Sequence, residues 1–508
     1  MNIRQCGKER PATTYSTSIV ALGLLGACLA IAAPRARAFS LLGPYASWMD
    51  EAKSFRQPDR DIGGPLNLDE GYRWNVPVVT YGFDASFLEY FGSNGVAEVE
   101  RAIDVFNRLP PASQLDPTDY PTQVIRVNSQ AASQGLIDLK SVTMFLLVEH
   151  LGLAEPERFT FCLRNSVQTA AGFQDSVIQR NFDPITLQPS SNLNDTAFVY
   201  SVWHSEDSSR ADAIESLADP SQPATSAVAD GISAPGQFFI GLSRDDVGGL
   251  RYLLSTNTVK YESLLPGVRG EGTNASSWID GAARPGVDKI TFVRQPFDAL
   301  LARFLPMTNQ FTDNYITNGA VQQQRVERVV SQPDFLFTAA DLQTGLPTVV
   351  RFARSGTSNW VNNALLNGRP TAAGPGTIQP PVTITFNKLG TVWATIGPGT
   401  DDQPEDQTVR WGTFDGTSNS PIAYPDPPEG TVRSTARLWL VFGDPSHQSS
   451  RSFEWPISGT ANAPFVLQTS TDLITWKPLT TNSNDGSVFT FFQRFPMSQR
   501  RFYRIVSD

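Results

Sequence analysis

The sequence predicts an α+β domain at the N-terminal end, followed by β-rich regions that end in a β-sandwich. Apolar residues recur at helical spacing in two segments before residue 255. After Val382, runs in which apolar and polar residues alternate take over, which is the pattern of half-buried strands. Glycine and proline account for 38 and 37 of 508 residues, and only 18% of the residues are charged, which is typical of turn-rich extracellular proteins.

The first 38 residues have the pattern of an export signal. A polar stretch with basic side chains runs into the apolar block 19–33, which is shorter than a bilayer span needs. The segment closes on two small residues, Ala36 and Ala38, which have the spacing that signal peptidase requires. We therefore expect cleavage before Phe39 and a secreted or cell-surface protein.

A second interpretation of this segment is a lipoprotein signal, in which Cys28 would carry a lipid. The apolar run continues past Cys28 to Ala33, which favours the longer signal cut after Ala38. That cut leaves Cys162 as the one cysteine of the mature chain, so no internal disulfide can form. Apolar neighbours favour a packing role for Cys162 over a nucleophilic one.

The charge of the chain bears on its partners. The formal net charge is −10, and removal of a signal with five basic residues and one acidic residue lowers it to −14. Nucleic acid binding depends on clustered lysine and arginine, and the sequence has neither a basic stripe nor a basic tail. No apolar run after the signal reaches the length of a membrane helix. We expect neither a nucleic-acid partner nor a membrane span.

The first folded region is expected over residues 39–255, with a strand at 78–83. A helix is predicted after Gly92, because apolar residues then recur every three to four positions. Asn94 can cap the start of this helix, and Pro110 ends it.

A second helix is predicted over residues 139–151. Asp138 supplies its N-cap, Gly152 can take the position after its end, and Pro156 follows where no helix can continue. Apolar residues cover most of its circumference, so we expect a helix that is buried on nearly all sides.

The rest of the chain is expected to be β-rich. Residues 256–366 form a mixed region of unassigned fold, residues 367–381 are rich in glycine and proline and indicate a linker, and residues 382–508 predict the β-sandwich. A turn-rich stretch at 421–430 would divide this tail into two small modules. The strand-like runs are 289–293, 335–337, 382–386, 432–442, 465–469 and 502–506.

The chain has three histidines, and the sequence contains no nucleophile elbow, phosphate-binding loop or paired-histidine zinc motif. His150 lies on the predicted buried helix without a second histidine one turn away. His204 lies near Glu206 and Asp207, and the imidazole and the two carboxylates could share a cation, although an ordinary polar loop is favoured. His447 is expected in a surface turn. No catalytic, cofactor-binding or metal-binding residue is assigned, and no cofactor is expected.

Two segments resemble the matrixin-type zinc metalloproteases, whose catalytic domain opens with a strand and a long helix and closes with a short helix. Residues 74–84 with 99–106 are similar to the opening, and residues 242–253, with their acidic pair, are similar to the closing helix. The chain lacks the family's histidine pair with its intervening glutamate. The resemblance therefore implies the scaffold without the reaction.

The end of the chain, at 467–476 and 501–504, is similar to C-terminal β-modules of exported bacterial proteins, which implies display, adhesion or export. Together these features predict a secreted protein with a non-catalytic binding or structural role, for an extracellular protein or carbohydrate ligand. Two alternatives remain open at this point. One is an active hydrolase with unconventional ligands drawn from His150, His204 and Glu206, and the other is a surface lipoprotein anchored through Cys28.

Overall fold

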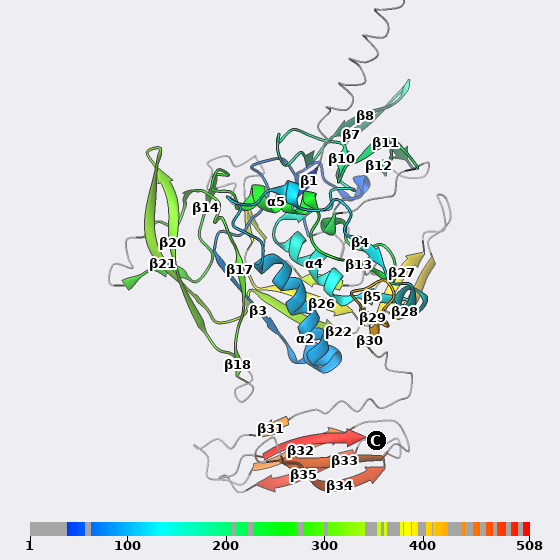
Figure 1. The fold of residues 1–508 in the computed structure, drawn as a ribbon, viewed down its shortest axis with the longest axis vertical. Helices are drawn as coiled ribbons and strands as arrows, with labels where there is room; N and C mark the ends of the chain where they lie inside the picture. Colours follow the sequence, from blue (N-terminus) through cyan, green and yellow to red (C-terminus); the bar gives the residue numbers. More distant parts are fainter. Residues whose placement is uncertain are drawn as a thin grey trace, which may run out of the picture. The chain divides into compact units, whose positions relative to one another are not determined.

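Figure 1 shows a computed structural model of the chain, which contains both helices and many strands in several sheets. The described residues are 38–55, 62–205, 210–221, 227–272, 278–298, 303–340, 353–356, 360–362, 376–378, 380–387, 389–394, 403–408, 410–424, 439–441, 451–457, 464–470, 475–483, 489–495 and 501–507. The structure is mixed and β-rich, as expected from the sequence.

A mixed five-stranded sheet lies at the centre of the fold, in the order β17-β3-β22-β26-β23 (Figure 1). The first four strands are parallel, and β23 runs antiparallel at the edge. Parallel strands are usually covered on both faces and read as continuous apolar runs, as the buried side chains of β3 and β22 do here. The strands are β3 (Val78–Phe83), β17 (Thr291–Arg294), β22 (Phe335–Ala340), β23 (Ala353–Gly356) and β26 (Val382–Asn387).

This pairing crosses the boundaries that the sequence suggested. Strands from residues 39–255, 256–366 and 382–508 share one sheet. Part of the expected linker is strand β25 (Gly376–Ile378), which pairs with β24 (Trp360–Asn362). Local composition could not reveal this arrangement, because the pairing partners lie hundreds of positions apart.

The long helix α2 (Ala85–Asn107) lies across one face of the central sheet (Figure 1). It begins well before the expected cap at Asn94. The side chain of Asp84 accepts a hydrogen bond from the backbone N–H of Phe87 at 2.9 Å, so Asp84 is the actual N-cap. The expected start was displaced because Gly92 interrupts the helix with a φ of 61°, which a glycine adopts without strain.

Aromatic side chains join this helix to the sheet. Phe87 and Phe91 of α2 pack on Phe386 of β26, with ring centroids 5.8 and 5.7 Å apart. Phe337 of β22 lies 6.4 Å from the ring of Phe87. Trp411, which follows the central sheet in the chain, belongs to the same cluster, and its ring centroid is 5.3 Å from that of Phe386.

The predicted core helix is confirmed as α4 (Leu139–His150), with Asp138 as its N-cap and Gly152 at a φ of 111° after its end. Ten of its twelve residues are buried, which agrees with the expected burial on nearly all sides. Residues 242–253 fall largely in a helix, α5 (Arg244–Leu254), which is capped by Ser243. The short helical segments are η1 (Glu51–Lys53), η2 (Pro117–Asp119), α3 (Ser129–Ser133) and η3 (Val228–Asp230).

Smaller sheets surround these elements. A four-stranded sheet places β1 between β2 and β6, with β9 also paired to β1. Two extended hairpins, β7–β8 and β11–β12, carry the segment from 162 to 217. The strands of these groups and their neighbours are β1 (Phe39–Gly43), β2 (Gly64–Leu66), β4 (Ile125–Val127), β5 (Leu136–Asp138), β6 (Leu153–Ala154), β7 (Cys162–Thr169), β8 (Gly172–Ile178), β9 (Asn181–Phe182), β10 (Asn192–Leu193), β11 (Thr196–His204), β12 (Ala211–Leu217) and β13 (Gln237–Phe239).

The middle region, whose fold the sequence left open, contributes a five-stranded sheet in the order β14-β16-β20-β21-β15. Its long hairpin β20–β21 pairs eleven residues on each side. The other strands of this region, beside those of the central sheet and β24, are β14 (Lys260–Glu262), β15 (Val268–Gly270), β16 (Ala282–Arg284), β18 (Phe297–Asp298), β19 (Arg303–Phe304), β20 (Met307–Thr317) and β21 (Ala320–Val330). After the central sheet follow β27 (Leu389–Ala394), β28 (Gln403–Thr408), β29 (Arg410–Thr413) and β30 (Ile422–Ala423).

The last part of the chain is all β among its described residues. Four strands pair in the order β31-β36-β33-β34, and β32 pairs with β35. The runs expected at 465–469 and 502–506 are strands, whereas only 439–441 of the run expected at 432–442 is described as one. The strands are β31 (Trp439–Val441), β32 (Arg451–Ile457), β33 (Pro464–Ser470), β34 (Lys477–Ser483), β35 (Phe489–Phe495) and β36 (Arg501–Ser507).

Candidate functional site

The first candidate is α4, the helix that carries His150. Its N-cap Asp138 accepts hydrogen bonds from the backbone N–H of Ser141 at 2.8 Å and from the Ser141 hydroxyl at 2.5 Å. Burial nevertheless raises the pKa of Asp138 to about 7, because the carboxylate is removed from water. Asp138 therefore orders the start of the helix, and a substantial fraction of it is protonated at pH 7.

His150 lies at the other end of α4 and is fully buried. Its Nδ1–H donates to the carbonyl oxygen of Leu146 at 2.7 Å, and the ring meets the ring of Phe335 edge to face at 6.0 Å. Burial lowers the pKa of His150 to about 4, so the ring is neutral at pH 7. Its Nε2 has no hydrogen-bond partner among the described residues. The imidazole is therefore placed as a packing group inside an aromatic core.

His204 is the last residue of strand β11. Its Nε2 is 3.1 Å from a carboxylate oxygen of Asp175, and its ring stacks on Phe173 with centroids 3.8 Å apart. Both partners belong to β8, so His204 joins the two hairpins. Glu206, the expected companion of His204, and His447 lie outside the described residues.

A polar cavity of about 220 Å³ lies beside Cys162, and charged side chains of both signs line it. Burial, with help from Glu157 and Asp212, raises the pKa of Glu215 in its wall to about 7. The guanidinium of Arg158 donates to the backbone carbonyl of Ser54 at 2.6 Å, so this cation is part of the wall structure. Burial also raises the pKa of the Cys162 thiol, which keeps the thiol protonated and unreactive at neutral pH.

The start of α5 holds two buried carboxylates with different surroundings. Asp246 is fully partnered: one oxygen accepts from the backbone and hydroxyl of Ser243 and from the backbone N–H of Val228, and the other accepts from Ala229, all within 3.0 Å. Asp246 therefore ties α5 to η3 and completes the N-cap of its own helix.

Only one of the two carboxylate oxygens of Asp245 has hydrogen-bond donors among the described residues. One of its oxygens accepts from the backbone N–H of Ala38 at 3.1 Å and from that of Asn194 at 2.6 Å. The other oxygen has no partner among the described residues, although the side chain is fully buried. Burial, opposed by those two hydrogen bonds and reinforced by Asp246 and Asp195, raises the pKa of Asp245 to about 8.

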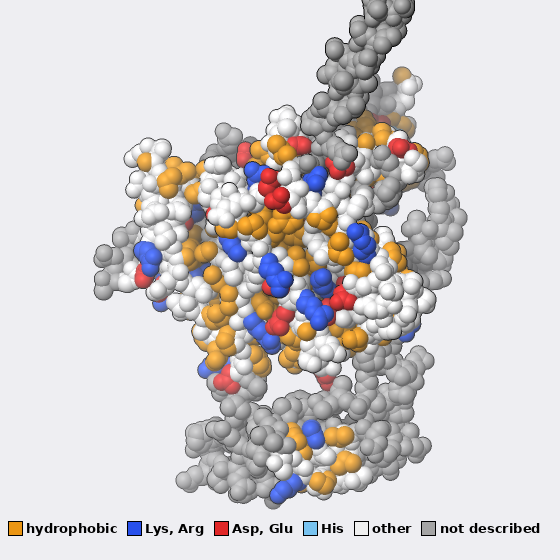
Figure 2. All heavy atoms as spheres, in the orientation of Figure 1, with side chains coloured by type: hydrophobic (Ala, Val, Ile, Leu, Met, Phe, Trp, Pro, Cys, Tyr) orange, Lys and Arg blue, Asp and Glu red, His pale blue; other side chains and the backbone are white. Residues whose placement is uncertain are grey.

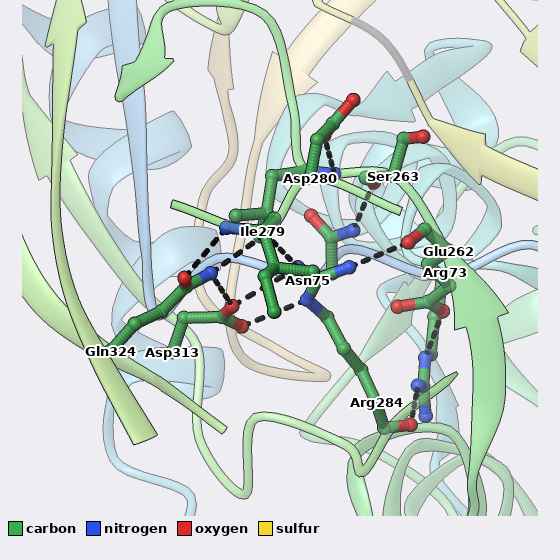
Figure 3. Close-up of polar contacts among 10 residues, drawn as sticks. Arg73, Asn75, Glu262, Ser263, Ile279, Asp280, Arg284, Asp313 and Gln324 are labelled. Atoms are coloured by element: carbon green, nitrogen blue, oxygen red, sulfur yellow. Dashed lines mark hydrogen bonds and ion pairs between the residues drawn. The ribbon is translucent and has the colours of Figure 1, made fainter. Parts of the chain in front are cut away.

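Figure 3 shows a third group of buried charged side chains, which come from distant parts of the chain. The sequence analysis did not identify this group, because no local sequence pattern distinguishes its members. Arg73 forms an ion pair with Glu262 at 2.5 Å and donates to the carbonyl oxygen of Arg284 at 2.9 Å. Arg284 pairs with Asp313 at 2.9 Å, and Gln324 donates to the same carboxylate at 2.7 Å. These four charged side chains are at most 5% exposed. They hold the middle sheet against residues 71–75.

The charged surface is mixed on the face shown in Figure 2, where basic and acidic side chains alternate. On α2, Arg101 pairs with Glu98 and Arg108 with Asp104, each at 2.5 Å. The expectation that the chain does not bind nucleic acid stays a prediction.

Two features are absent from the described residues. No three side chains of histidine, cysteine, aspartate or glutamate among them lie together in a way that could hold a metal ion. In the same part of the chain, no helix combines the length and the apolarity needed to cross a membrane. Compared with protein-family models, curated proteins and solved structures, the chain gives no match.

Proposed function

We propose that this chain is a secreted, bacterial-type protein that acts by binding or as a structural component, on a scaffold similar to that of the matrixin-type zinc metalloproteases. The order of elements supports the likeness. Strand β3 leads into the long helix α2, and α5 carries the buried acidic pair Asp245 and Asp246 at its start. Helix α4 lies between them in the chain.

The observation that carries the proposal is the state of His150. A zinc hydrolase needs several imidazole or carboxylate ligands around one ion and a base beside it. His150 is the single histidine of α4; its Nδ1 is hydrogen-bonded to the same helix, and Phe335 covers its ring. A fully buried, neutral ring that packs on Phe335 stabilises the fold by packing, and no second histidine of α4 joins it as a ligand.

We propose that the tail is a β-sandwich used for display or adhesion at the cell surface. Two antiparallel pairings, β31-β36-β33-β34 and β32–β35, supply strands for two sheets. The Arg504 guanidinium of β36 lies 4.4 Å from the centre of the Trp476 ring, just before β34, which is a cation–π contact. An extracellular protein or a carbohydrate is the expected class of ligand.

Metal analysis of the purified mature protein tests the proposal. We expect far less than one zinc per chain and no zinc-dependent cleavage of an unfolded protein substrate. His204→Ala should change neither result, with His447→Ala as the matched control. Stoichiometric zinc and zinc-dependent cleavage that both disappear in His204→Ala, but not in His447→Ala, would show an active hydrolase with unconventional ligands and would overturn the binding proposal.

A further inference from the structure

The polar cavity of about 220 Å³ beside Cys162 is enclosed by three segments that are distant in the chain. These are residues 53–55 at the end of η1, residues 158–162 at the start of β7, and residues 212–215 of β12. Ile214 lines the cavity and is 46% exposed, so the cavity reaches the surface. Since a cavity of about 150 Å³ holds a benzene molecule, this one can hold a group the size of an amino-acid residue.

The wall that β12 contributes is the edge of a strand. On its other edge, β12 pairs with β11 over its whole length. No strand among those described in the structure pairs with the second edge, although β7 and η1 lie beside β12. An unpaired strand edge presents backbone N–H and C=O groups to which another extended chain can bond.

The hydrogen bonds between β11 and β12 show which backbone groups point to the unpaired edge. Just beyond β12, the Ala218 N–H donates to the carbonyl oxygen of Ala197 at 2.9 Å, and the register of the two strands is continuous. Because bonded and non-bonded pairs alternate in an antiparallel ladder, the even-numbered residues of β12 bond to β11. The backbone groups of Ala213 and Glu215 therefore point to the unpaired edge, and the Glu215 N–H bonds its own carboxylate there.

The charges around the cavity leave one carboxylate without an ion pair. The two cations of the wall each have a carboxylate already: Lys53 lies 2.5 Å from Asp50, and Arg158 lies 3.5 Å from Glu155. Glu215 forms no ion pair with any described residue. An additional positive charge is therefore better accommodated at Glu215 than an additional negative charge beside the two cations.

The groups near Glu215 reinforce this preference. Burial, together with the carboxylates of Glu157 and Asp212, raises the pKa of Glu215, and the nearby guanidinium of Arg158 offsets this only in part. A cation that entered the cavity would stabilise the ionised form of Glu215. A primary ammonium group brings such a charge together with three N–H donors.

We propose that this cavity binds the N-terminal end of an extended peptide, with its ammonium group at Glu215 and its backbone along the unpaired edge of β12. The first carbonyl oxygen of the peptide would accept from the Ala213 N–H, and the next N–H would donate to the Ala213 carbonyl oxygen. The stacked rings of Phe55 and Phe159, 6.1 Å apart, line the same cavity and favour an apolar first side chain. This inference rests on the proposed binding role and names the class of ligand.

The experiment compares two peptides that differ only at the N-terminus. Leucyl-alanine amide carries the ammonium group, and its N-acetyl derivative has an uncharged amide in its place. Saturation-transfer NMR measures the binding of each to the full exported chain at neutral pH. We expect the acetylated peptide to bind at least tenfold more weakly than the free amine.

Three variants locate the site. Glu215→Gln keeps the shape of the side chain but removes its charge, and it should weaken binding of leucyl-alanine amide at least tenfold. Ala213→Pro removes an N–H that makes no bond to β11, and we expect a similar loss. Asp219→Asn is the matched control, because it removes an exposed carboxylate just beyond β12, and it should leave binding unchanged.

Equal binding of the two peptides to the wild-type chain overturns the inference, because the ammonium group would then not be recognised. This comparison does not depend on whether any variant folds. Absence of binding by either peptide also overturns the inference, but it leaves the proposed non-catalytic role standing. Unchanged binding in folded Glu215→Gln or Ala213→Pro excludes the β12 edge as the site. A zinc-dependent activity, in contrast, overturns the proposed function without affecting the comparison of the peptides.

Discussion

At the scale of single residues, burial decides what each ionisable group can do. Three ionisable groups are fully buried: the carboxyl groups of Asp138 and Asp245 and the imidazole of His150. In each case removal from water shifts the pKa in the direction that favours the neutral form. Sequence reasoning identified Asp138 as a helix cap and His150 as a core residue. It could not predict that only one carboxylate oxygen of Asp245 accepts hydrogen bonds, because the two donors, Ala38 and Asn194, are distant in the chain.

Asp138 provides a test of this burial through the pH dependence of stability. Its pKa is about 7 in the folded protein, whereas the ordinary value for an aspartate side chain is 3.8. Because the folded state holds the proton more tightly, the contribution of Asp138 is full below pH 4 and is lost as the pH rises through 7. We expect the stability of wild type relative to Asp138→Asn to fall by up to about 1.4 kcal/mol per pH unit between these limits. Urea unfolding at several pH values measures this difference, and a difference that is constant with pH would contradict it.

At the scale of elements, close packing explains a local pattern that propensity disfavours. Helix α5 contains two adjacent glycines, although glycine weakens a helix interior by about 1 kcal/mol relative to alanine. A Cβ on Gly248 would lie 2.4 Å from Pro184, and one on Gly249 would lie 2.7 Å from Leu153. The glycines let α5 approach these residues.

Gly249→Ala should therefore destabilise the protein despite its better helix propensity. Overpacking typically costs about 1–3 kcal/mol, and we expect a loss in this range by urea unfolding at pH 7. Gly241→Ala is the matched control, because a Cβ there meets nothing within 4 Å, and we expect a change within about 0.5 kcal/mol. Equal effects of the two substitutions would refute the packing explanation.

Element prediction succeeded where caps and periodicity agree. Asp138, Gly152 and the apolar face between them located α4 within one residue of its end. The start of α2 was predicted too late. The sequence analysis placed it after Gly92, but the helix begins after its cap Asp84 and continues through a kink at Gly92. Short edge strands such as β6 and β9 leave no pattern of their own, since their hydrogen-bond partner β1 is far away in sequence.

At the scale of the whole molecule, the central sheet determines which parts of the chain need one another. Strands β17, β22 and β26 all come after residue 255, yet they flank or extend β3. Strand β29 also pairs with β5, between residues 410–412 and 136–138. The described strands from residue 439 onward pair only with one another. Composition predicted boundaries at turn-rich stretches, but it contains no information on which strands pair.

Truncation tests this dependence. A fragment of residues 39–255 keeps α2 and α4 but loses the strands on which α2 packs, and we expect it to be protease-sensitive and without a cooperative thermal transition. A fragment of residues 39–424 keeps the whole central sheet and should unfold cooperatively. Circular dichroism and limited proteolysis of both fragments measure this. Cooperative unfolding of 39–255 would restore the boundary that the sequence suggested.

The central claim is that the histidine of α4, His150, is a buried, neutral packing residue and does not bind a metal ion. Measurement of the His150 ring by ¹⁵N NMR in the exported protein tests this claim most directly. We predict a neutral ring with the proton on Nδ1 from pH 5 to pH 8, a pKa of about 4, and no change on addition of zinc. A zinc-dependent shift of the Nε2 resonance, or a ring that titrates near the ordinary histidine pKa, would contradict the claim.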